Sequence, residues 1–353
     1  MGMAESIQNI LAAESIEASA PCRIDMGGTL DISCFYYPLA HLNPCTVNIA
    51  VNLRTRVQLT PHRSGYVKIS SQGFDSVEYG LDQLPFEHPM GLMFAIAAYY
   101  RIDGIHVRIT SQSPPRSALG GSSVAAVAMI GAYQKLLARL DADDGDMDRV
   151  RIPLLAHAIE ESVAGVPCGL QDPLAAAFGG VNAWYWNGIG FKDFYKQNPL
   201  VPADQYSLLD KSILLAYCGK PHTSKDINSR WVRQFISGEV RNEWAEIVTC
   251  TREFASAIKS FDFASAAFWM NRETDIRCRL TPDVLDGTGR SLVSEARQSN
   301  CGARFCGAGG GGCLWAVGSS DNIAALNEKW RHLLKEIDDS RLLTVSVDAA
   351  GLT

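Results

Sequence analysis

A short glycine-serine stretch carries the residues whose types and spacing best suit phosphate chemistry. Residues 120–123 read Gly-Gly-Ser-Ser and lie between Pro114-Pro115 and a run of helix-forming residues that reaches Leu137. A loop that enters a helix in this way directs free backbone N–H groups and the positive end of the helix dipole toward one point, where a phosphate fits well. The two hydroxyls could cap the helix, bind Mg²⁺, or do one each; a serine-capped core helix without a ligand is the alternative.

Arg23 and Asp25 are candidates for a second part of a site because of the segment that holds them. Residues 21–31 read Pro-Cys-Arg-Ile-Asp-Met-Gly-Gly-Thr-Leu-Asp, which predicts a short strand followed by a glycine turn. A strand that carries an arginine and an aspartate and ends in two glycines suggests side chains that face a cleft. A surface arginine and a turn aspartate are the alternative.

Two carboxylates, Glu160 and Asp172, lie on either side of a helix break. Residues 165–172 read Gly-Val-Pro-Cys-Gly-Leu-Gln-Asp, so the first carboxylate stands near a helix end and the second follows the break. Carboxylates placed in this way could converge on one metal ion or substrate. The alternative is a solvated glutamate and an aspartate that caps a helix with Pro173 at its first position.

A late glycine-rich segment, residues 302–313, reads Gly-Ala-Arg-Phe-Cys-Gly-Ala-Gly-Gly-Gly-Gly-Cys. Gly307, Gly309 and Gly312 match the pattern G-x-G-x-x-G, but a strand-like segment follows, where a Rossmann dinucleotide site needs a helix. The chain also has no G-x-x-x-x-G-K-[S/T] sequence, which excludes the P-loop. A glycine run that enters a strand could still press its backbone against a bound nucleotide or another loop.

Composition and charge limit the class of protein. The 353 residues exceed the usual size of one hydrophobic core, so two domains are expected, and 47% hydrophobic and 20% charged residues are typical of a soluble protein. The net charge of −6 argues against a general nucleic-acid binder. The ten cysteines form no C-x-x-C pair and are expected to be buried free thiols in a reducing compartment. No apolar run is long enough to cross a membrane.

Both halves of the chain mix strand-like and helix-like segments, and no internal repeat is visible. Strands are expected at 20–26, 46–60, 65–71 (as the hairpin partner of 46–60), 105–110, 181–186, 212–217, 313–317 and 342–347. Helices are expected at 89–101, 122–137, 152–163, 223–237, 240–259, 262–275, 284–299 and 323–337. Residues 1–19 hold no lysine or arginine and are expected to be a tail or short helix, not a signal peptide.

In combination, these stretches resemble the GHMP kinases, the family of galactose, homoserine, mevalonate and phosphomevalonate kinases. That family has a Pro-x-Arg/Lys strand with a glycine turn, a Pro-x-x-x-Gly-Leu-Gly-Ser-Ser-Ala loop and a late glycine turn; residues 21–31, 115–125 and 302–313 are similar to them, in this order. Residues 165–172 are similar to the galactokinase pattern Gly-x-Pro-Cys-Gly-Ile-Met-Asp, and residues 171–180 look like bacterial heptose-phosphate kinases. The loop reads Gly-Gly where the family has Leu-Gly, and the galactokinase Glu-His is missing, which leaves the sugar open.

The resemblance implies a two-domain α+β fold with the active site in the cleft between the domains. The N-terminal kinase domain would span 20–200 and the C-terminal one 201–353, with the boundary near 190–207. Asp172 would accept the proton of a substrate hydroxyl, and Arg23 would hold Asp172 ionised and stabilise the transferring phosphoryl group. Ser123 and Glu160 would bind Mg²⁺.

Further residues take roles from the same resemblance. Those implied to bind the sugar are Gly28, Thr29, Asp31, Gln171 and His222. Those implied to hold the phosphates of ATP are Pro115, Ser117, Ala118, Leu119, Gly120, Gly121, Ser122 and Ser123, with a supporting turn of Gly307, Gly309, Gly310 and Gly311.

These implications predict a cytoplasmic kinase, monomeric or homodimeric, that uses ATP and Mg²⁺ to phosphorylate a sugar or sugar phosphate, with the anomeric C1 hydroxyl favoured. No nucleic-acid or membrane partner is expected. A sugar phosphate would need extra basic groups, for which the candidates are Lys220, His222, Lys225 and Arg230. Two alternatives stay open: a sensor that binds ATP and sugar without turnover, and a kinase for a mevalonate-type alcohol, which the longer stretch before Asp172 disfavours.

Overall fold

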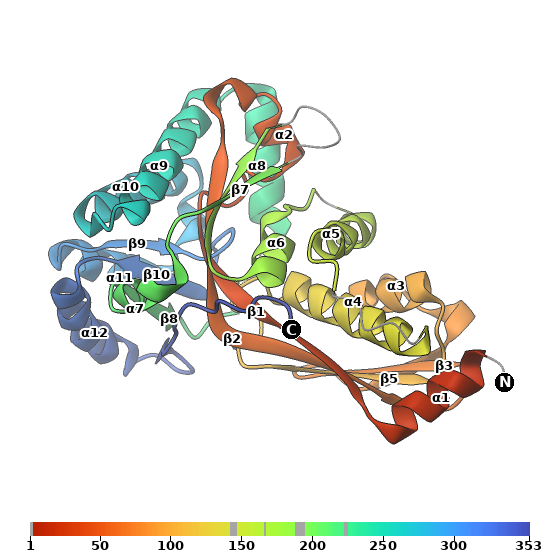
Figure 1. The fold of residues 1–353 in the computed structure, drawn as a ribbon. Coiled ribbons are helices and arrows are strands. Elements are labelled where there is room, and N and C mark those ends of the chain that lie inside the picture. Colours follow the sequence, from red (N-terminus) through yellow and green to blue (C-terminus); the bar gives the residue numbers. More distant parts are fainter. Residues whose placement is uncertain (1–2, 142–146, 166, 188–194, 222–224) are drawn as a thin grey trace.

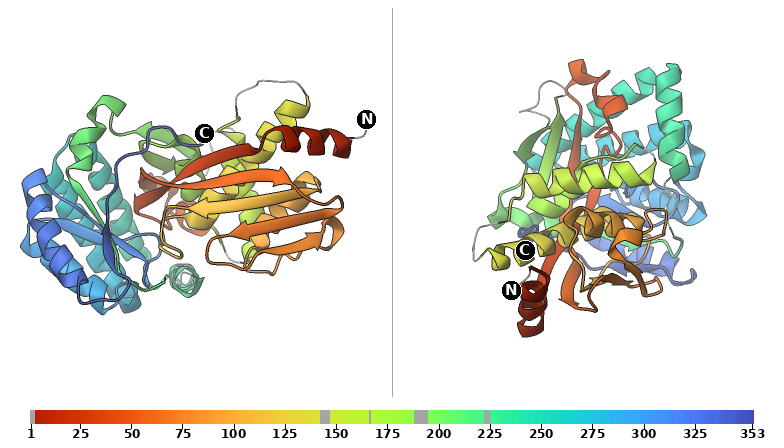
Figure 2. Two further views of the ribbon diagram at one scale, coloured as in Figure 1. Left: turned by 90° about the horizontal axis from the view of Figure 1, so that it is seen from below. Right: turned by 90° about the vertical axis from the view of Figure 1, so that its right-hand side faces the viewer.

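The computed structural model describes residues 3–141, 147–165, 167–187, 195–221 and 225–353. It has an α+β fold in which two β-sheets, each with its own helices, lie at opposite ends of the molecule (Figures 1 and 2). The expected fold class is therefore confirmed. His222 lies outside the described residues, and so do residues 142–146 of the stretch 141–148, which reads Asp-Ala-Asp-Asp-Gly-Asp-Met-Asp and was expected to be an acidic linker.

The first sheet contains the strands that carry most of the predicted site. Its order is β4-β3-β5-β2-β6-β7, and β1 pairs with β2. The strands are β1 (Ile16–Met26), β2 (Cys45–Pro61), β3 (Tyr66–Ser71), β4 (Val77–Gly80), β5 (Ile105–Ser111), β6 (Val181–Trp186) and β7 (Tyr195–Pro199). A register shift between Pro21 and Cys22 sets Arg23 opposite Ala50 and Asp25 opposite Asn48 on β2.

The expectation that 65–71 forms a hairpin with 46–60 is wrong. β3 pairs with β4 in antiparallel and with β5 in parallel orientation, so β5 lies between β2 and β3. The buried side chains of Ile105, Val107 and Ile109 give β5 an apolar face that both neighbours extend. Short loops favour hairpins, but β3 pairs with a strand further along the chain instead, and local sequence cannot reveal such a long-range pairing.

One face of the first sheet is covered by helices, and α4 is the central one. Its residues from Val124 to Tyr133 are all buried, which explains its uniformly apolar sequence. The helices of this part are α1 (Met3–Ala13), α2 (Ser33–Tyr36), α3 (Gly91–Tyr100), α4 (Gly121–Leu140), α5 (Arg151–Ala164) and α6 (Gln171–Phe178), with 3₁₀ turns at Ala40–Leu42 and Leu81–Gln83. Figure 1 shows α3, α4 and α5 together above β3 and β5.

The second sheet has the order β11-β8-β10-β9. Its strands are β8 (Ile213–Tyr217), β9 (Gly302–Phe305), β10 (Cys313–Val317) and β11 (Arg341–Leu343). The helices of this half are α7 (Tyr206–Asp210), α8 (Lys225–Ser237), α9 (Arg241–Lys259), α10 (Phe263–Leu280), α11 (Gly287–Gln298) and α12 (Ser320–Leu334), with 3₁₀ turns at Ala203–Gln205 and Pro282–Val284. The strand β10 does follow the glycine-rich turn, as the sequence predicts.

The two ends of the chain depart from the expected domain limits. β1 begins at Ile16, so residues 16–19 are strand rather than tail. The last residues return to the first sheet, where Val347 bridges to Val51 and Thr353 exchanges backbone hydrogen bonds of 2.9 Å with Ser19. The limits 20–200 and 201–353 otherwise stay predictions.

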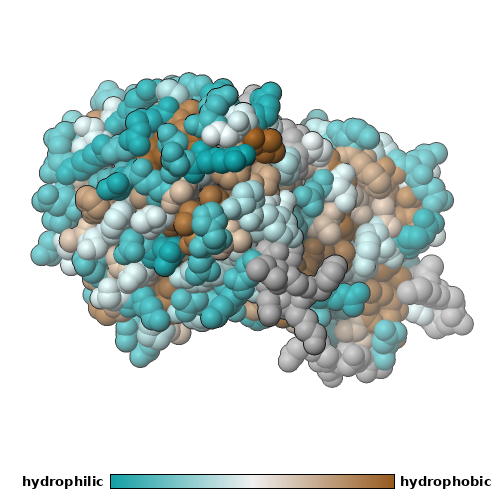
Figure 3. Space-filling view, turned by 90° about the horizontal axis from the view of Figure 1, so that it is seen from above, coloured by the Kyte–Doolittle hydropathy of each residue, from teal (hydrophilic) through white to brown (hydrophobic). Residues whose placement is uncertain are grey.

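The remaining features of the fold are the state of the cysteines, the length and polarity of the helices, and the polarity of the surface. None of the ten cysteines, all of which lie in the described ranges, forms a disulfide, and desolvation raises the pKa of the buried Cys22 thiol to about 11. Within the described ranges, the helices are too short or too polar to cross a bilayer. The face in Figure 3 mixes hydrophilic residues with smaller apolar areas.

Candidate active site

A cleft of about 650 Å³ brings the separate motifs together. Its walls come from β1, from residues 114–121, which we call the phosphate loop, from the segment after α5 and from the late glycine turn at 302–313. The predicted site residues that line it are Arg23, Thr29, Asp31, Pro115, Ser117, Ala118, Gly120, Gly121, Ser122, Ser123, Glu160, Gln171, Asp172 and Gly307. Residues that are far apart in the sequence thus share one cavity.

Arg23 and Asp172 form a two-pronged ion pair inside this cleft. The Nε and Nη2 atoms of Arg23 donate to the two carboxylate oxygens of Asp172 over 2.7 and 2.8 Å. Burial by itself lowers the pKa of Arg23, but the carboxylates of Asp172 and Asp25 outweigh it, so the pKa lies above the ordinary value. The guanidinium stays charged and fixes the direction in which the Asp172 carboxylate points.

The idea that Asp172 caps a helix is wrong. α6 already begins at Gln171, and its N-cap, Leu170, makes no side-chain cap bond. The Asp172 side chain turns to Arg23 on β1 instead, and 21% of it remains exposed in the cleft. A carboxylate that is oriented by a buried arginine and still open to a ligand is suited to accept a proton from a bound hydroxyl.

The phosphate loop bends through left-handed backbone at every second residue. Arg116, Ala118 and Gly120 have φ of 53°, 63° and 80°. Alternation of this kind forms concavities of backbone N–H groups that bind anions. The strained conformation of Arg116 and Ala118, two non-glycine residues, is the kind that concentrates at ligand sites.

Gly120 is required at the end of this loop for two reasons. Its positive φ disfavours any residue with a Cβ, and a Cβ there would stand 3.3 Å from the Asp172 carboxylate oxygen. The helix α4 starts at the next residue, so its N-terminus opens beside Asp172. Leu119, in contrast, is fully buried and does not line the cleft; its carbonyl accepts the N–H of Arg23 over 3.2 Å.

Ser122 and Ser123 do not cap α4, because Gly120 is the N-cap and makes no side-chain bond. Both hydroxyls donate to Glu160 on α5, over 3.0 Å from Ser122 and 2.7 Å from Ser123. Burial raises the pKa of Glu160, with the Ser123 bond opposing it. A hydroxyl and a carboxylate beside a phosphate cradle are oxygen ligands of the kind Mg²⁺ takes, so the residues present fit this ion.

Asp31 and Gln171 form a second polar group in the cleft. The backbone N–H of Gln171 donates to Asp31 over 3.0 Å, and the Gln171 side-chain oxygen accepts from Asn48 on β2 over 2.9 Å. Burial, with a smaller contribution from Asp172, raises the pKa of Asp31 to about 7, although the Gln171 N–H lowers it. Gly169 packs against the Asp31 carboxylate so closely that a Cβ would overlap it.

The late glycine turn supports the phosphate loop from the other half of the molecule. The N–H of Gly307 donates to Asp25 over 2.7 Å, and the N–H of Cys313 donates to the carbonyl of Ser117 over 2.8 Å. Gly309, Gly310 and Gly311 do not line the cleft, and neither does Gly28. The turn therefore contacts the phosphate loop, which was one of the two possibilities, while Gly307 also lines the cleft, so contact with a nucleotide stays a prediction.

Several cleft residues were missed by sequence reasoning. Arg116 lies exposed on the phosphate loop and adds a positive charge there. The apolar lining of the cleft includes Phe74, Met90, Leu92, Met93 and Ile109. The Gln-Gly-Phe sequence at 72–74, with an exposed aromatic residue, was the one local signal for it.

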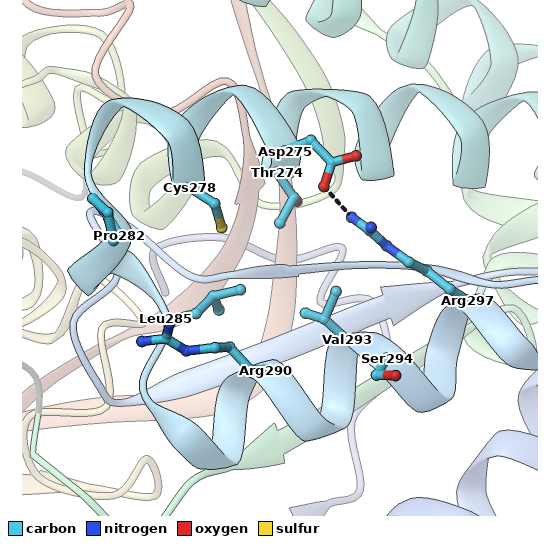
Figure 4. A pocket seen from close by; sticks show the side chains of 9 residues that line it. All are labelled: Thr274, Asp275, Cys278, Pro282, Leu285, Arg290, Val293, Ser294 and Arg297. Carbon is cyan, nitrogen blue, oxygen red and sulfur yellow. Dashed lines mark hydrogen bonds and ion pairs between the residues drawn. The ribbon is translucent and has the colours of Figure 1, made fainter.

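A smaller depression of about 310 Å³ lies between α10 and α11, away from the cleft. Figure 4 shows Asp275 and Arg297 turned toward one another across it, and they form an ion pair of 2.6 Å. The apolar floor includes Leu285 and Val293. None of the predicted site residues that the structure describes lies in its wall.

Comparison with known proteins agrees with this geometry. Residues 89–180 match the family model described as GHMP kinases N terminal domain, a range that includes the phosphate loop, Glu160 and Asp172. The chain is 26% identical over 330 residues to a mevalonate kinase of Pyrococcus abyssi, covering 85% of this chain and 88% of that protein.

Two solved structures share the fold. The galactokinase of Lactococcus lactis complexed with galactose has a TM-score of 0.73 at 16% identity, with 100% of both chains covered. A D-glycero-D-manno-heptose 1-phosphate kinase from Bacteriodes thetaiotaomicron has a TM-score of 0.71 at 18% identity, with 96% of this chain and 97% of that chain covered. The chain thus contains a GHMP kinase N-terminal domain and shares the fold of these solved kinases, so the resemblance expected from the sequence is confirmed. Its kinase relatives support a phosphotransferase that acts on an alcohol group, and they differ in the acceptor.

Proposed function

We propose that this protein transfers the γ-phosphoryl group of ATP to a hydroxyl of a sugar, with the anomeric hydroxyl as the favoured position. The observation that carries the proposal is the Arg23–Asp172 pair at the mouth of α4, in one cleft with the phosphate loop and Asp31. Phosphoryl transfer passes through a loose transition state, so catalysis depends on positioned charges rather than on a covalent enzyme intermediate. The cleft supplies such charges on both sides of the transferring group.

Each residue has a task that follows from its position. The loop N–H groups and Arg116 bind the phosphates, and Asp172 takes the proton of the attacking hydroxyl. Arg23 holds Asp172 in place and stabilises negative charge on the transferring group. Mg²⁺, when held by Ser123 and Glu160, neutralises phosphate charge. The apolar part of the cleft accommodates the purine base.

The acceptor side supports a neutral polyol over an acid. Asp31, Asp172 and the amide of Gln171 face the space beside the transferred group, and carboxylates accept hydrogen bonds from hydroxyls. An acceptor that carries its own carboxylate would be repelled by them. Lys220 and Arg230, candidates for binding a sugar phosphate, are instead paired with Asp286 and Asp283 over 3.5 and 3.4 Å. His222 and the Lys225 side chain lie outside the described residues.

A mevalonate-type acceptor is the second candidate. Its support is the similarity to the mevalonate kinase, which extends over most of both chains. A sensor without turnover has less support, because Arg23, Asp172, Ser123 and Glu160 are all present and in contact.

Release of ADP in the presence of Mg²⁺ and a panel of acceptors tests the proposal. The panel contains free hexoses and heptoses, their phosphates, and mevalonate, and phosphorus NMR of the product locates the phosphoryl group. We expect turnover with a free sugar and a product phosphorylated at C1. Turnover with mevalonate alone would favour the second candidate, and binding of ATP without turnover on any acceptor would favour the sensor.

The raised pKa of Asp31 predicts a pH effect on acceptor binding. Above a pKa of about 7 the carboxylate is ionised and accepts from sugar hydroxyls, whereas below it the proton occupies one oxygen. We therefore expect the acceptor KM to fall about tenfold between pH 6 and pH 8, as for one ionising group. Because Asp31 binds its proton more tightly in the folded than in the unfolded chain, its contribution to stability falls as pH rises from about 4 to about 7. The Asp31→Asn variant should show a pH-independent acceptor KM; an unchanged profile in it would contradict the assignment.

The metal assignment predicts a specific defect in Ser123→Ala. Loss of one of the two protein ligands should raise the Mg²⁺ concentration needed for half-maximal turnover by about tenfold or more. Ser122→Ala is the matched control, because its hydroxyl also bonds Glu160 but lies one residue away from the proposed metal position. Equal Mg²⁺ requirements in the two variants would argue against the metal assignment for Ser123.

A further inference from the structure

Six charged side chains form one alternating chain from the cleft into the second half of the molecule. Beyond the Asp172–Arg23 pair, Arg23 lies 3.5 Å from Asp25, and Asp25 accepts from Arg304 over 2.9 Å. Arg304 and Arg277 then share Glu273, over 3.2 and 2.8 Å. Three positive and three negative charges alternate along this path, so the chain is neutral as a whole.

The distant members of this chain hold the backbone of the first segment directly. Arg277, on α10, donates to the carbonyl of Gly28 over 2.7 Å. Arg304, on β9, donates to the carbonyl of Asp25 over 2.5 Å, and the indole N–H of Trp315 donates to the same carbonyl over 3.0 Å. Side chains of the second half of the molecule therefore bind, through hydrogen bonds, the end of β1 and the turn that carries Thr29 and Asp31.

Arg277 and Arg304 are charged, and the residues packed around them also hold them in place. The guanidinium of Arg277 lies 4.5 Å from the ring centroids of both Trp231 and Trp244, and Arg304, Arg277 and Glu273 have fully buried side chains. Such stacking leaves Arg277 one orientation. Burial of charge is costly, and a packed apolar cluster of equal volume often stabilises a protein as well or better. A role beyond stability is therefore indicated.

We propose that Arg277, Glu273 and Arg304 position the turn at residues 27–31, and through Asp25 the Arg23 guanidinium, for binding and phosphorylation of the acceptor. The inference rests on the proposed kinase function and adds positioning residues from α10 and β9 to it. Arg277 contacts the turn at Gly28, three residues from Asp31, and its side-chain hydrogen bonds to described residues go to Gly28 and Glu273. Its loss should affect the acceptor while leaving ATP binding intact.

The variants Arg277→Lys and Arg277→Met test this division. Lysine keeps a positive charge beside Glu273, but its single nitrogen cannot span the two acceptors that Nε and Nη2 of Arg277 reach, Glu273 and the Gly28 carbonyl. The lysine variant also serves where the methionine variant does not fold. We expect the acceptor kcat/KM to fall about 100-fold in Arg277→Met, as displacements of about 1 Å cause, and less in Arg277→Lys. The KM for ATP should stay within about twofold of wild type, since the loop is untouched.

Arg272→Met is the matched control. Arg272 lies on the same helix and pairs with Glu246 over 2.7 Å, but it faces solvent. We expect wild-type kinetics from it. Arg277 variants that match this control, or that lose ATP and acceptor binding in equal proportion, would overturn the inference.

Amide hydrogen exchange of the free protein separates this inference from the proposed function. The turn is closed by backbone bonds from Leu30 to Gly27 and from Ile32 to Thr29, so exchange in residues 27–32 reports its order without any substrate. Exchange there should be faster in Arg277→Lys than in Arg272→Met. Unchanged exchange in that segment would refute positioning, whereas a wild-type protein that phosphorylates no acceptor would refute only the kinase function.

Discussion

Asp172→Asn is expected to lower kcat by about 1,000-fold, within the range that a positioned general base contributes. Asparagine has nearly the same shape, so the α6 start and the contact with Gly120 are preserved, but its amide cannot take the proton of the attacking hydroxyl. The KM for ATP should change little, because we propose that the nucleotide binds to the loop rather than to this carboxylate. Initial rates of ADP release, with the melting temperature measured in parallel, provide the test.

Asp31→Asn is the control for that experiment, since it places the same substitution on the neighbouring carboxylate. Asp31 is proposed to bind the acceptor and not to receive the proton, so its variant should raise the acceptor KM with a smaller loss of kcat. Full turnover by Asp172→Asn would remove the general-base role. Equal kinetic defects in the two variants would show that neither carboxylate has a distinct task.

Arg23→Met is expected to have the second large effect, on both turnover and stability. Arginines that stabilise a transferring phosphoryl group contribute about 10³-fold or more to kcat. The substitution also leaves Asp172 and the fully buried Asp25 without their shared partner, and breaking such a pair costs about 3–5 kcal/mol of unfolding free energy. Burial alone raises the pKa of Asp25, and Arg304 and Arg23 together lower it below its ordinary value. Urea unfolding and steady-state kinetics measure the two effects separately.

Arg54→Met separates loss of stability from loss of chemistry. Arg54 makes a comparable set of contacts, to Asp348 over 2.5 Å and to the carbonyls of Ser19 and Gly351 over 2.8 and 2.7 Å, but away from the cleft. It should lower stability and leave kcat near wild type at temperatures where the protein is folded. A turnover defect like that of Arg23→Met would mean that Arg23 acts through stability alone.

Local sequence determined those parts of this protein that depend on neighbouring residues. The glycines and prolines before residue 122 predict a loop that ends where a helix begins, and α4 does begin there, because backbone freedom and helix propensity are properties of a short segment. The strand β10 after the glycine turn, the helix α5 and the rejection of a Rossmann site follow from the same kind of local rule. The resemblance of four such stretches to one family then assigned Asp172, which no local rule singles out.

Tertiary structure alone decided which polar groups meet. Arg23 and Asp172 are 149 positions apart, and Arg277 and Gly28 are 249 apart. From the sequence, Asp172 was suited to cap α6, and Ser122 and Ser123 were suited to cap α4. In the structure, Asp172 pairs with Arg23 on β1, and both serines donate to Glu160 on α5 instead. The insertion of β5 between β2 and β3 has the same origin. Pairing of buried charges and strands is chosen by the free energy of the whole packed core, which compares partners that no window of sequence contains.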